Sequence, residues 1–209
     1  MFLGHFAVGL AGRTLTPSVS LGTWFLAVQL VDLVWPFFLL TGLEHVRIVP
    51  GITKFTPLDF SHYPFTHSLV AGAVWALLLV LARPGALRQP RTAAMLAGGV
   101  LSHWFLDALV HRPDLPVLPN GPYVGLGLWN NVAATLVIEL TLFAVALALY
   151  VRTRRPGMSF WLMIVALLAA YVGAGFGPPP PDVQTLAFSA LAVWLFVLWA
   201  WYSDRPAKR

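Results

Sequence analysis

The chain has 209 residues, of which 58% are hydrophobic and only 10% are charged, and its formal net charge is +5. Soluble domains carry about 25% charged residues, so this composition predicts an integral membrane protein and argues against an ordinary soluble domain. The chain has no cysteine, which excludes disulfides and thiolate metal sites, so a bound metal would need histidine nitrogen and carboxylate oxygen. In a membrane protein a positive charge reports topology, so nucleic-acid binding is not expected.

Apolar segments suited to membrane helices recur along the chain, given that a bilayer core requires roughly 17–25 apolar residues per helix. Residues 2–12 are too few to cross and predict a short or re-entrant helix. They lack the basic leading region of a signal peptide, so we expect them in the mature fold. Six candidate spans follow at residues 21–40, 67–81 (marginal in length), 92–110, 129–151, 159–176 and 185–202. We therefore expect an all-α, polytopic membrane protein with about six transmembrane helices plus a short N-terminal helix.

The polar residues are distributed unevenly within what we expect to be a single integral membrane domain over residues 1–209. All six histidines lie within the first 111 residues. The last two candidate spans contain no histidine and no charged residue. We therefore expect residues 1–140 to hold the functional site and residues 141–209 to serve as scaffold helices.

Basic residues at the ends of the candidate spans predict their orientation. One set of ends carries ten of them: Arg13, Arg83, Arg88, Arg91, Arg152, Arg154, Arg155, Arg205, Lys208 and Arg209. The other set carries only Arg47, Lys54 and Arg112. The positive-inside rule assigns the richer side to the cytoplasm. We therefore expect the plasma (inner) membrane, a cytoplasmic C-terminus, and outward-facing loops at residues 41–66 and 111–128.

The densest group of titratable residues is His103, Asp107 and His111. Their i, i+4, i+8 spacing places all three along one side of one helix. His103 and Asp107 can hold one cation, as neighbouring ligands do on metalloprotease helices, and Asp107 could bridge two metals. His111, one turn further on, could serve a second metal or the substrate. Ionisable groups are costly inside a membrane, so this group predicts a functional site.

A second group lies between the first two candidate spans, where residues 59–68 read Asp-Phe-Ser-His-Tyr-Pro-Phe-Thr-His-Ser. Pro64 interrupts any continuous helix, so we expect Asp59 and His62 on a loop. Thr66 is a candidate N-cap of the next helix, with His67 in its first turn. A helix N-terminus also favours a nearby anion such as phosphate.

The expected topology brings polar residues from several segments to one depth, in the outer half of the membrane. Asp32 lies in the outer half of the first span, His67 opens the second, and His103 and Asp107 lie in the third. His5 joins them if its short helix starts within the membrane. Secondary candidates are Glu44, His45, His111 and Glu139.

Most of these residues also have an ordinary structural interpretation. His5 alone could be a packed, hydrogen-bonded histidine, and Asp32 a polar contact between helices. Glu44, His45 and Asp59 fall where a loop would carry polar residues anyway. Glu139 fits a partner of a ligand, a proton relay or a helix-packing contact equally well, and Asn130 and Asn131 could be helix caps.

Four short motifs occur in a fixed order: Gly4-His5, then Asp32 late in the next apolar run, then His62-Tyr-Pro-Phe-Thr-His67-Ser68, then Ser102-His103-Trp-Phe-Leu-Asp107. This order resembles that of the YdjM-like family of membrane-bound metal-dependent hydrolases. In that family the third motif is roughly His-Arg-Gly-x-Thr-His-Ser and the fourth Ser-His-x-x-x-Asp. The resemblance covers about the first half of the chain. It implies a divalent-metal hydrolase site carried by His5, Asp32, His62, His67, His103 and Asp107.

The chain departs from the family pattern at two places. The family's aspartate motif is typically Pro-Asp-x-Asp, whereas this chain has a single carboxylate, Asp32, which leaves a two-metal site incomplete unless Glu44 or Asp59 replaces the second. Tyr63 stands where the family has arginine, so Arg47 or Lys54 would have to supply any contact to an anion. The motif order is also similar to that of zinc-dependent phospholipases and related nucleases, which suggests phosphoester chemistry.

The sequence therefore favours a membrane-embedded metal-dependent hydrolase that acts on a phosphoester or other ester of a lipid-like substrate at the outer leaflet. Zinc is the expected metal, with manganese as the alternative, and His62 or Asp59 is the expected general base. The expected metal ligands are His5, Asp32, His67, His103 and Asp107. The alternatives are a metal-ion or proton transporter, which also needs titratable residues in the membrane, and a non-catalytic membrane protein with a vestigial site. The lipid bilayer is the expected partner, and the sequence does not indicate an oligomeric state.

Overall fold

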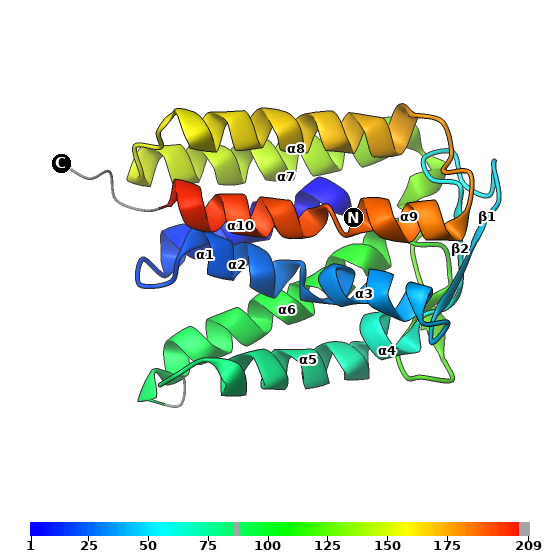
Figure 1. Ribbon diagram of the computed structural model, residues 1–209, viewed down its shortest axis with the longest axis horizontal. Helices are drawn as coiled ribbons and strands as arrows, with labels where there is room; N and C mark the ends of the chain where they lie inside the picture. The colour runs from blue at the N-terminus through cyan, green and yellow to red at the C-terminus, as the bar shows by residue number, and fades with distance from the viewer. Residues whose placement is uncertain (86–87, 205–209) are drawn as a thin grey trace.

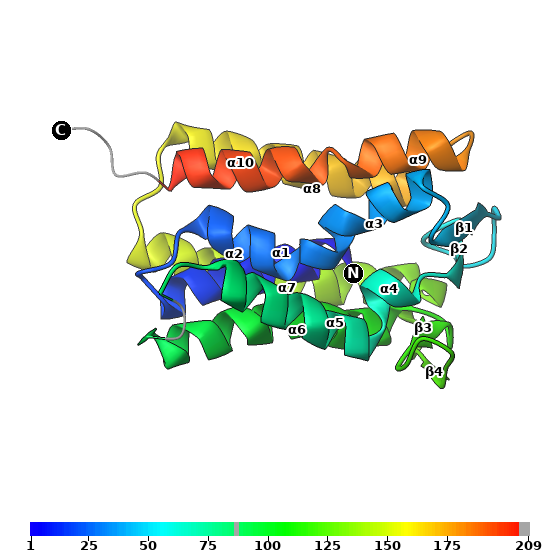
Figure 2. The same ribbon diagram turned by 60° about the horizontal axis from the view of Figure 1, so that its bottom comes forward.

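The chain folds mostly into helices that lie roughly side by side, with short strands confined to one end of the bundle (Figures 1 and 2). The computed structural model describes residues 1–85 and 88–204. Large apolar side chains cover the outer faces of the helices, and Val137, Val165 and Leu195 are each more than 60% exposed. An outer surface of this kind suits lipid, because soluble monomers rarely expose extended apolar patches.

Four helical segments are long and apolar enough to cross a membrane. Three are the continuous helices α6 (Pro90–Val110), α7 (Val132–Thr153) and α8 (Met158–Phe176). The fourth is formed by α9 (Val183–Ala190) and α10 (Val193–Ser203), which follow one another with a short interruption. These helices correspond to the four candidate spans of residues 92–202, so the sequence prediction is confirmed for this part of the chain.

The earlier part of the chain is less regular than the sequence predicts. The first candidate span is broken at Gln29 into α2 (Leu21–Val28) and α3 (Leu30–Leu40), which meet at a bend of 53°. The second is α5 (Leu69–Ala82), whose 14 residues extend about 21 Å and fall short of a bilayer core. The structure thus has four apolar helices that could span a membrane, or five if the bent pair counts as one span.

The short N-terminal helix, α1 (Phe2–Leu15), lies in the middle of the bundle and is largely buried against α2, α6 and α7 (Figure 1). Glycines on α1 permit this close packing. A Cβ atom at Gly9 would lie 2.7 Å from the Phe25 ring, and one at Gly12 would lie 2.4 Å from the Trp24 ring. The prediction of a short helix near the N-terminus is confirmed, and the helix extends three residues beyond residue 12.

Two small antiparallel hairpins close one end of the bundle (Figure 2). One pairs β1 (His45–Ile48) with β2 (Leu58–His62), and the other pairs β3 (Leu115–Pro116) with β4 (Tyr123–Val124). The expectation that Asp59 and His62 lie on a loop is wrong, because both belong to β2 and His62 pairs with His45 of β1. A long-range strand pairing of this kind leaves no local signal next to Pro64.

The helix cap near the middle motif also differs from the prediction. A single turn, α4 (Pro64–His67), starts at Pro64 and contains both Thr66 and His67. Ser68 caps α5, since its Oγ accepts a hydrogen bond of 3.1 Å from the Ala71 backbone N–H. Thr66 is therefore not the cap, because its hydroxyl is used elsewhere, as described below.

Of the two asparagines considered as helix caps, Asn131 caps α7. A short 3₁₀ turn, η2 (Leu128–Asn130), precedes α7, and the Asn131 side chain accepts a hydrogen bond from the Ala134 backbone N–H.

The basic residues gather at the end of the bundle opposite the hairpins. This end contains the C-terminal ends of α1, α5 and α7 and the N-terminal ends of α6 and α8 (Figure 1). The described members of the predicted cytoplasmic set lie at or beside these helix ends: Arg13, Arg83, Arg88, Arg91, Arg152, Arg154 and Arg155. The remaining three, Arg205, Lys208 and Arg209, lie outside the described residues.

Candidate metal centre

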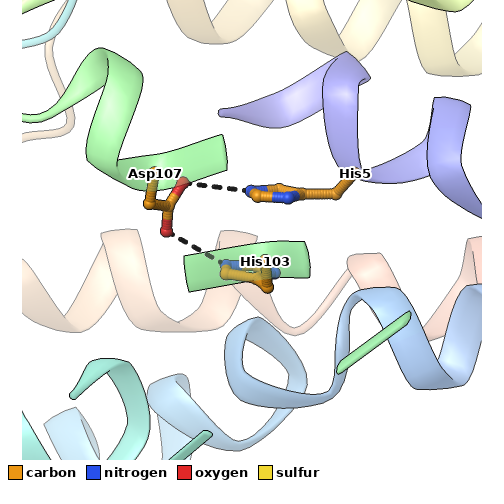
Figure 3. A group of neighbouring side chains, drawn as sticks. All are labelled: His5, His103 and Asp107. Carbon is orange, nitrogen blue, oxygen red and sulfur yellow. Dashed lines mark hydrogen bonds and ion pairs between the residues drawn. The ribbon is translucent and has the colours of Figure 1, made fainter. Parts of the chain in front are cut away.

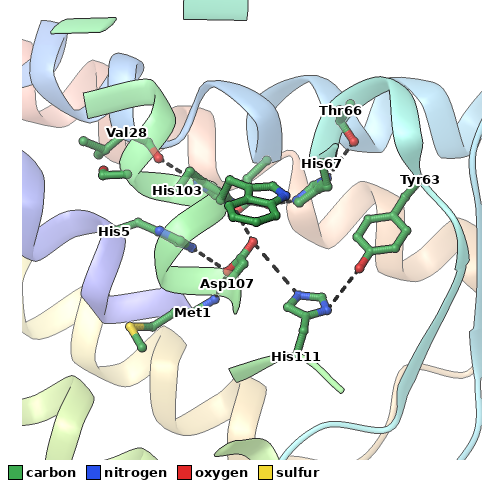
Figure 4. Close-up of polar contacts among 12 residues, drawn as sticks. Met1, His5, Val28, Tyr63, Thr66, His67, His103, Asp107 and His111 are labelled. Atoms are coloured by element: carbon green, nitrogen blue, oxygen red, sulfur yellow. Dashed lines mark hydrogen bonds and ion pairs between the residues drawn. The ribbon is translucent and has the colours of Figure 1, made fainter. Parts of the chain in front are cut away.

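Five buried or half-buried side chains from four helices meet near the middle of the molecule (Figure 4). They form two overlapping groups whose ligand atoms lie within 4.8 Å of one another: His5, His103 and Asp107, and Asp32, His67 and His103. His5 comes from α1, Asp32 from α3, His67 from α4, and the remaining two from α6. The structure thus brings together all five side chains that the sequence analysis expected as ligands, and His103 belongs to both groups.

The distances within these groups suit a small cation. His103 Nε2 lies 3.2 Å from Asp107 Oδ2 and 3.6 Å from Asp32 Oδ1, and His67 Nε2 lies 3.2 Å from Asp32 Oδ1. Bonds of about 2.1 Å in a tetrahedral zinc site hold neighbouring donor atoms about 3.4 Å apart. The donor atoms therefore have the spacing that a metal ion would require.

The backbone fixes the tautomer of His103. Its Nδ1 lies 2.8 Å from the carbonyl oxygen of Val28 (Figure 4), an acceptor only, so Nδ1 carries the proton and donates it. Val28 ends α2 at the bend, where helix carbonyls lack intrahelical partners. In the neutral ring Nε2 is unprotonated, and it faces the two carboxylates of Asp32 and Asp107. A lone pair directed at two anions is unfavourable, so this position requires a cation, either a proton on Nε2 or a metal ion between the groups.

A separate chain of hydrogen bonds fixes the tautomer of His67. The Thr66 hydroxyl donates its proton to Glu44 Oε2 at 2.7 Å, because a carboxylate only accepts. Thr66 Oγ1 must therefore accept from His67 Nδ1, which lies 2.6 Å away. In the neutral ring His67 Nε2 is then unprotonated and faces Asp32 Oδ1 at 3.2 Å, whereas a protonated ring would donate to this oxygen. Metal-bound histidines typically donate their other ring N–H in this way, which fixes the ring's orientation.

Glu44 thus helps to orient His67 without being a candidate ligand itself. Its carboxylate is 1% exposed and accepts the backbone N–H groups of Phe65 at 2.7 Å and Thr66 at 2.9 Å, in addition to the Thr66 hydroxyl. These bonds hold the α4 turn and, through Thr66, the ring of His67. Glu44 therefore does not replace the carboxylate missing after Asp32, since it lies on the far side of His67 from the ligand atoms.

His111 adds a third imidazole beside Asp107. Its Nδ1 lies 3.1 Å from Asp114 Oδ1 and 3.2 Å from the Tyr63 hydroxyl, while its Nε2 lies 4.0 Å from Asp107 Oδ2. Burial lowers the pKa of His111 below its ordinary value, which favours the neutral ring. Burial also raises the pKa of Tyr63 well above its ordinary range, and the negative charge of Asp114 adds to this, so the hydroxyl stays protonated. His111 lies outside both ligand groups but faces a member of one.

His5 is held in place from two sides. Its ring stacks on that of His103, with centroids 3.6 Å apart and planes within 6° (Figure 3), and its Nε2 lies 3.1 Å from Asp107 Oδ1. Glu139, which is fully buried, accepts the backbone N–H groups of Leu3 at 2.7 Å and of Gly4 at 3.4 Å. Of the three roles considered for Glu139, the structure shows a packing contact that anchors the start of α1. The amino group of Met1 also contacts Asp107.

Asp59 and His62, the expected general bases, lie outside the ligand groups. Both Asp59 oxygens are engaged: Arg47 donates to Oδ2, with its Nε at 2.8 Å, and Arg112 donates to Oδ1 at 2.7 Å. Arg112 also donates to Asp114, at 3.0 Å. This network connects the β1–β2 hairpin to Asp114, the partner of His111. Because Asp59 lies outside the ligand groups and pairs with two arginines, it is a structural anchor here.

The remaining histidines, His45 and His62, face each other on the hairpin of β1 and β2, with ring centroids 6.0 Å apart. Both are exposed, and neither belongs to a ligand group. Sequence reasoning missed the residues that fix the rings, namely Thr66, Asp114 and the Val28 carbonyl. Asp114 could have been found from its i, i+3 spacing to His111, whereas a backbone carbonyl leaves no sequence signal.

Comparisons with protein-family models, curated proteins and solved structures find no match to this chain.

Proposed function

We propose that the protein is an integral membrane hydrolase that uses one divalent metal ion, held by Asp32, His67 and His103. The observation that carries the proposal is the convergence of two imidazole Nε2 atoms on the same Asp32 oxygen, with both Nδ1 atoms already hydrogen-bonded. In the neutral rings two lone pairs are then directed at this oxygen, and one divalent ion would satisfy both. Neutral imidazole and carboxylate are the ligands that zinc accepts, and manganese is the alternative.

His103 argues for one ion rather than two. Its Nδ1 is used by Val28, and its Nε2 has a single lone pair, so His103 can bind one ion although it belongs to both groups. We assign that ion to the group with His67, because His67 is oriented by its own hydrogen bonds. Three protein ligands leave a position for water, which is the arrangement of catalytic zinc sites.

Asp107 is then the residue placed to accept a proton. It lies 3.2 Å from His103 and between His5 and His111, and it is 2% exposed. A bound metal would lower the pKa of its water and polarise a phosphoryl or acyl oxygen. Asp107 would take the proton from that water, and the neutral His111, whose Nδ1 is held by Asp114, would accept the proton from Asp107 at Nε2. The similarity of the motif order to the YdjM-like hydrolases and to zinc phospholipases supports ester or phosphoester hydrolysis.

The proposed membrane placement puts the basic helix ends in the cytoplasm, following the positive-inside rule. The hairpins then lie on the outer side, and the metal centre lies toward them, in the outer half of the membrane. About six spans result if the bent pair α2–α3 and the short α5 are both counted. The substrate is accordingly a lipid-like ester, since the site lies within the bundle and is reached from the bilayer or its outer interface.

The decisive test is metal analysis of purified protein. We expect about one divalent ion per chain in the wild type and loss of that ion in His103→Ala and in His67→Ala. His45→Ala is the matched control, because His45 is an exposed histidine outside both groups and should keep the metal. Absence of metal from the wild type, or its retention in both site variants, would contradict the proposal.

One observation favours a transporter as the second candidate. Broken helices often line ion sites in transporters, and the bend of 53° between α2 and α3 lies three residues before Asp32. A transporter built from two repeats would have polar residues in both halves, yet α8, α9 and α10 bring none to this site. Metal-dependent ion flux in proteoliposomes without ester turnover would favour transport, and a protein that binds no metal would favour a vestigial site.

A further inference from the structure

A cavity of about 690 Å³ opens beside the candidate metal centre. It lies between α3, residues 50–58, the end of α8, and the junction of α9 with α10. Its size falls in the range of about 300–1,000 Å³ that is typical of small-molecule sites. It reaches the metal centre, because Asp32 forms part of its wall.

Small side chains keep this cavity open. The wall formed by α8 and its C-cap consists of Ala170, Gly173, Ala174, Gly175 and Gly177. A Cβ atom added at Gly173 would meet no atom within 4 Å, whereas one at Gly175 would lie 2.7 Å from the ring of Phe55, which also lines the cavity. Larger side chains at these positions would therefore fill the cavity or displace Phe55.

Asp32 is the point of contact between cavity and metal centre. Its side chain is 32% exposed, whereas those of its neighbours His67 and His103 are 5% and 3% exposed. Both imidazoles are therefore shielded by the surrounding protein, so a ligand in the cavity would contact the metal centre at Asp32. The other charged residue on the cavity wall is Lys54, which is exposed in the outer segment of residues 50–58. A bound divalent ion and Lys54 would both favour a negative charge in the ligand.

We propose that this cavity binds an anionic amphiphile, with its apolar chain against α8, α9 and α10 and its phosphate-like head at the Asp32 edge. The inference rests on the proposed metal centre for the head and on the cavity itself for the chain. Burying each methylene is worth about 0.8 kcal/mol, so each added methylene should tighten binding roughly three- to fourfold until the cavity is full. An apolar wall is also a poor path for a hydrated ion, which makes a lipid-like substrate the better match than an ion.

The test measures binding of octyl, dodecyl and hexadecyl phosphate to the metal-loaded protein by native mass spectrometry from neutral detergent. Inorganic phosphate and dodecyltrimethylammonium are the comparison probes. We expect affinity to rise with chain length, inorganic phosphate to bind at least about a hundredfold more weakly than dodecyl phosphate, and the cationic amphiphile to bind more weakly than its anionic counterpart.

Ala174→Leu fills the cavity from α8 and should weaken dodecyl phosphate binding by about tenfold or more, while the metal stays bound. Ala169→Leu on the same helix is the matched control, because Ala169 is exposed and does not line the cavity, and its affinity should stay within about twofold. Ser189→Leu, from the α9 wall, gives a second obstruction should Ala174→Leu fold poorly.

Two results would overturn the inference: unchanged dodecyl phosphate binding in both Ala174→Leu and Ser189→Leu, or equal binding of the anionic and cationic amphiphiles. A metal-loaded wild type that binds no alkyl phosphate would also overturn the inference, without contradicting the proposed metal centre. Conversely, the wild type could bind alkyl phosphate without containing metal, and Ala174→Leu could abolish that binding. This result would contradict the hydrolase proposal and support the cavity as the binding site of the alkyl chain.

Discussion

Two clusters of buried charge lie near the two ends of α1, and they differ in the groups that contact their carboxylates. Near its C-terminal end, Asp204 accepts from Arg13 Nε at 2.8 Å, from the Leu21 backbone N–H at 2.9 Å and from the Tyr150 hydroxyl at 3.3 Å. Every contact of this carboxylate is a donor, and Arg13 balances its charge. Near the N-terminal end, Asp32 faces the Nε2 atoms of two imidazoles whose Nδ1 atoms are hydrogen-bonded elsewhere.

This difference separates a structural ion pair from a binding site. A buried charge is tolerable when the protein supplies its own counter-charge and hydrogen bonds, as Arg13 does for Asp204. In the described residues Asp32 pairs with two imidazoles and not with an arginine or lysine, so its counter-charge is either a proton on an imidazole or an added cation. Asp32 is also 32% exposed, whereas the side chain of Asp204 is 6% exposed. The kind of partner and the access to the carboxylate are what distinguish the two clusters.

The largest expected effect comes from the cluster that needs an added cation. His103→Ala removes the nitrogen shared by both ligand groups, so we expect loss of the metal and a fall in ester turnover of at least about a thousandfold. Metal content and turnover of a model phosphodiester would be measured together. Asp107→Asn sharpens the result: turnover should fall while the metal remains bound, and loss of metal there would make Asp107 a ligand instead of the base.

The other cluster should affect stability and leave metal binding alone. Arg13→Met leaves the buried carboxylate of Asp204 without its arginine partner. The free energy of unfolding should fall by about 3 kcal/mol, or roughly 150-fold in the folding equilibrium. The measurement is thermal or denaturant unfolding in detergent, with metal content determined on the folded fraction. If Arg13→Met lost metal but not stability, the contrast between the two clusters would fail.

An intermediate effect is expected from the residues that orient His67. Thr66→Val removes the hydroxyl that accepts from His67 Nδ1, and such partners typically contribute about 10- to 100-fold in metal affinity. Thr66→Ser retains the hydroxyl and is the control, with affinity close to that of the wild type. Competition with a chelator of known affinity gives the measurement, and equal affinities in the two variants would remove the orienting role of Thr66.

The smallest effect is expected at Asp182, an exposed carboxylate that belongs to neither cluster. Asp182 caps α9, and the Thr185 backbone N–H, at 2.6 Å, holds the pKa of its carboxyl below the ordinary value. Because the folded pKa is depressed, the stabilisation is present above the unfolded pKa of about 3.9 and is lost as pH falls through the lower folded value. Asp182→Ser should therefore melt slightly below the wild type at pH 7 and together with it near pH 2. A difference that persists unchanged in acid would contradict the capping role.

Much of the fold follows from the sequence because span length and hydrophobicity are local properties. The helices of residues 90–203, the short α1, the marginal length of α5 and the membership of the five-residue cluster were all predicted. The break at Gln29 and the strands that carry His45 and His62 were not. These depend on packing and strand pairing between distant segments, which no local pattern encodes.

The sequence by itself determined which ionisable residues are brought to one depth, because each costly polar group inside an apolar run has to be accommodated by the fold. Only the tertiary structure decided what each residue does there. It turned Glu44 into the anchor of Thr66 and His67, committed Asp59 to two arginines, and placed the Val28 carbonyl against His103. Those roles depend on hydrogen bonds between residues 12 to 75 positions apart in the chain, which no local sequence pattern specifies.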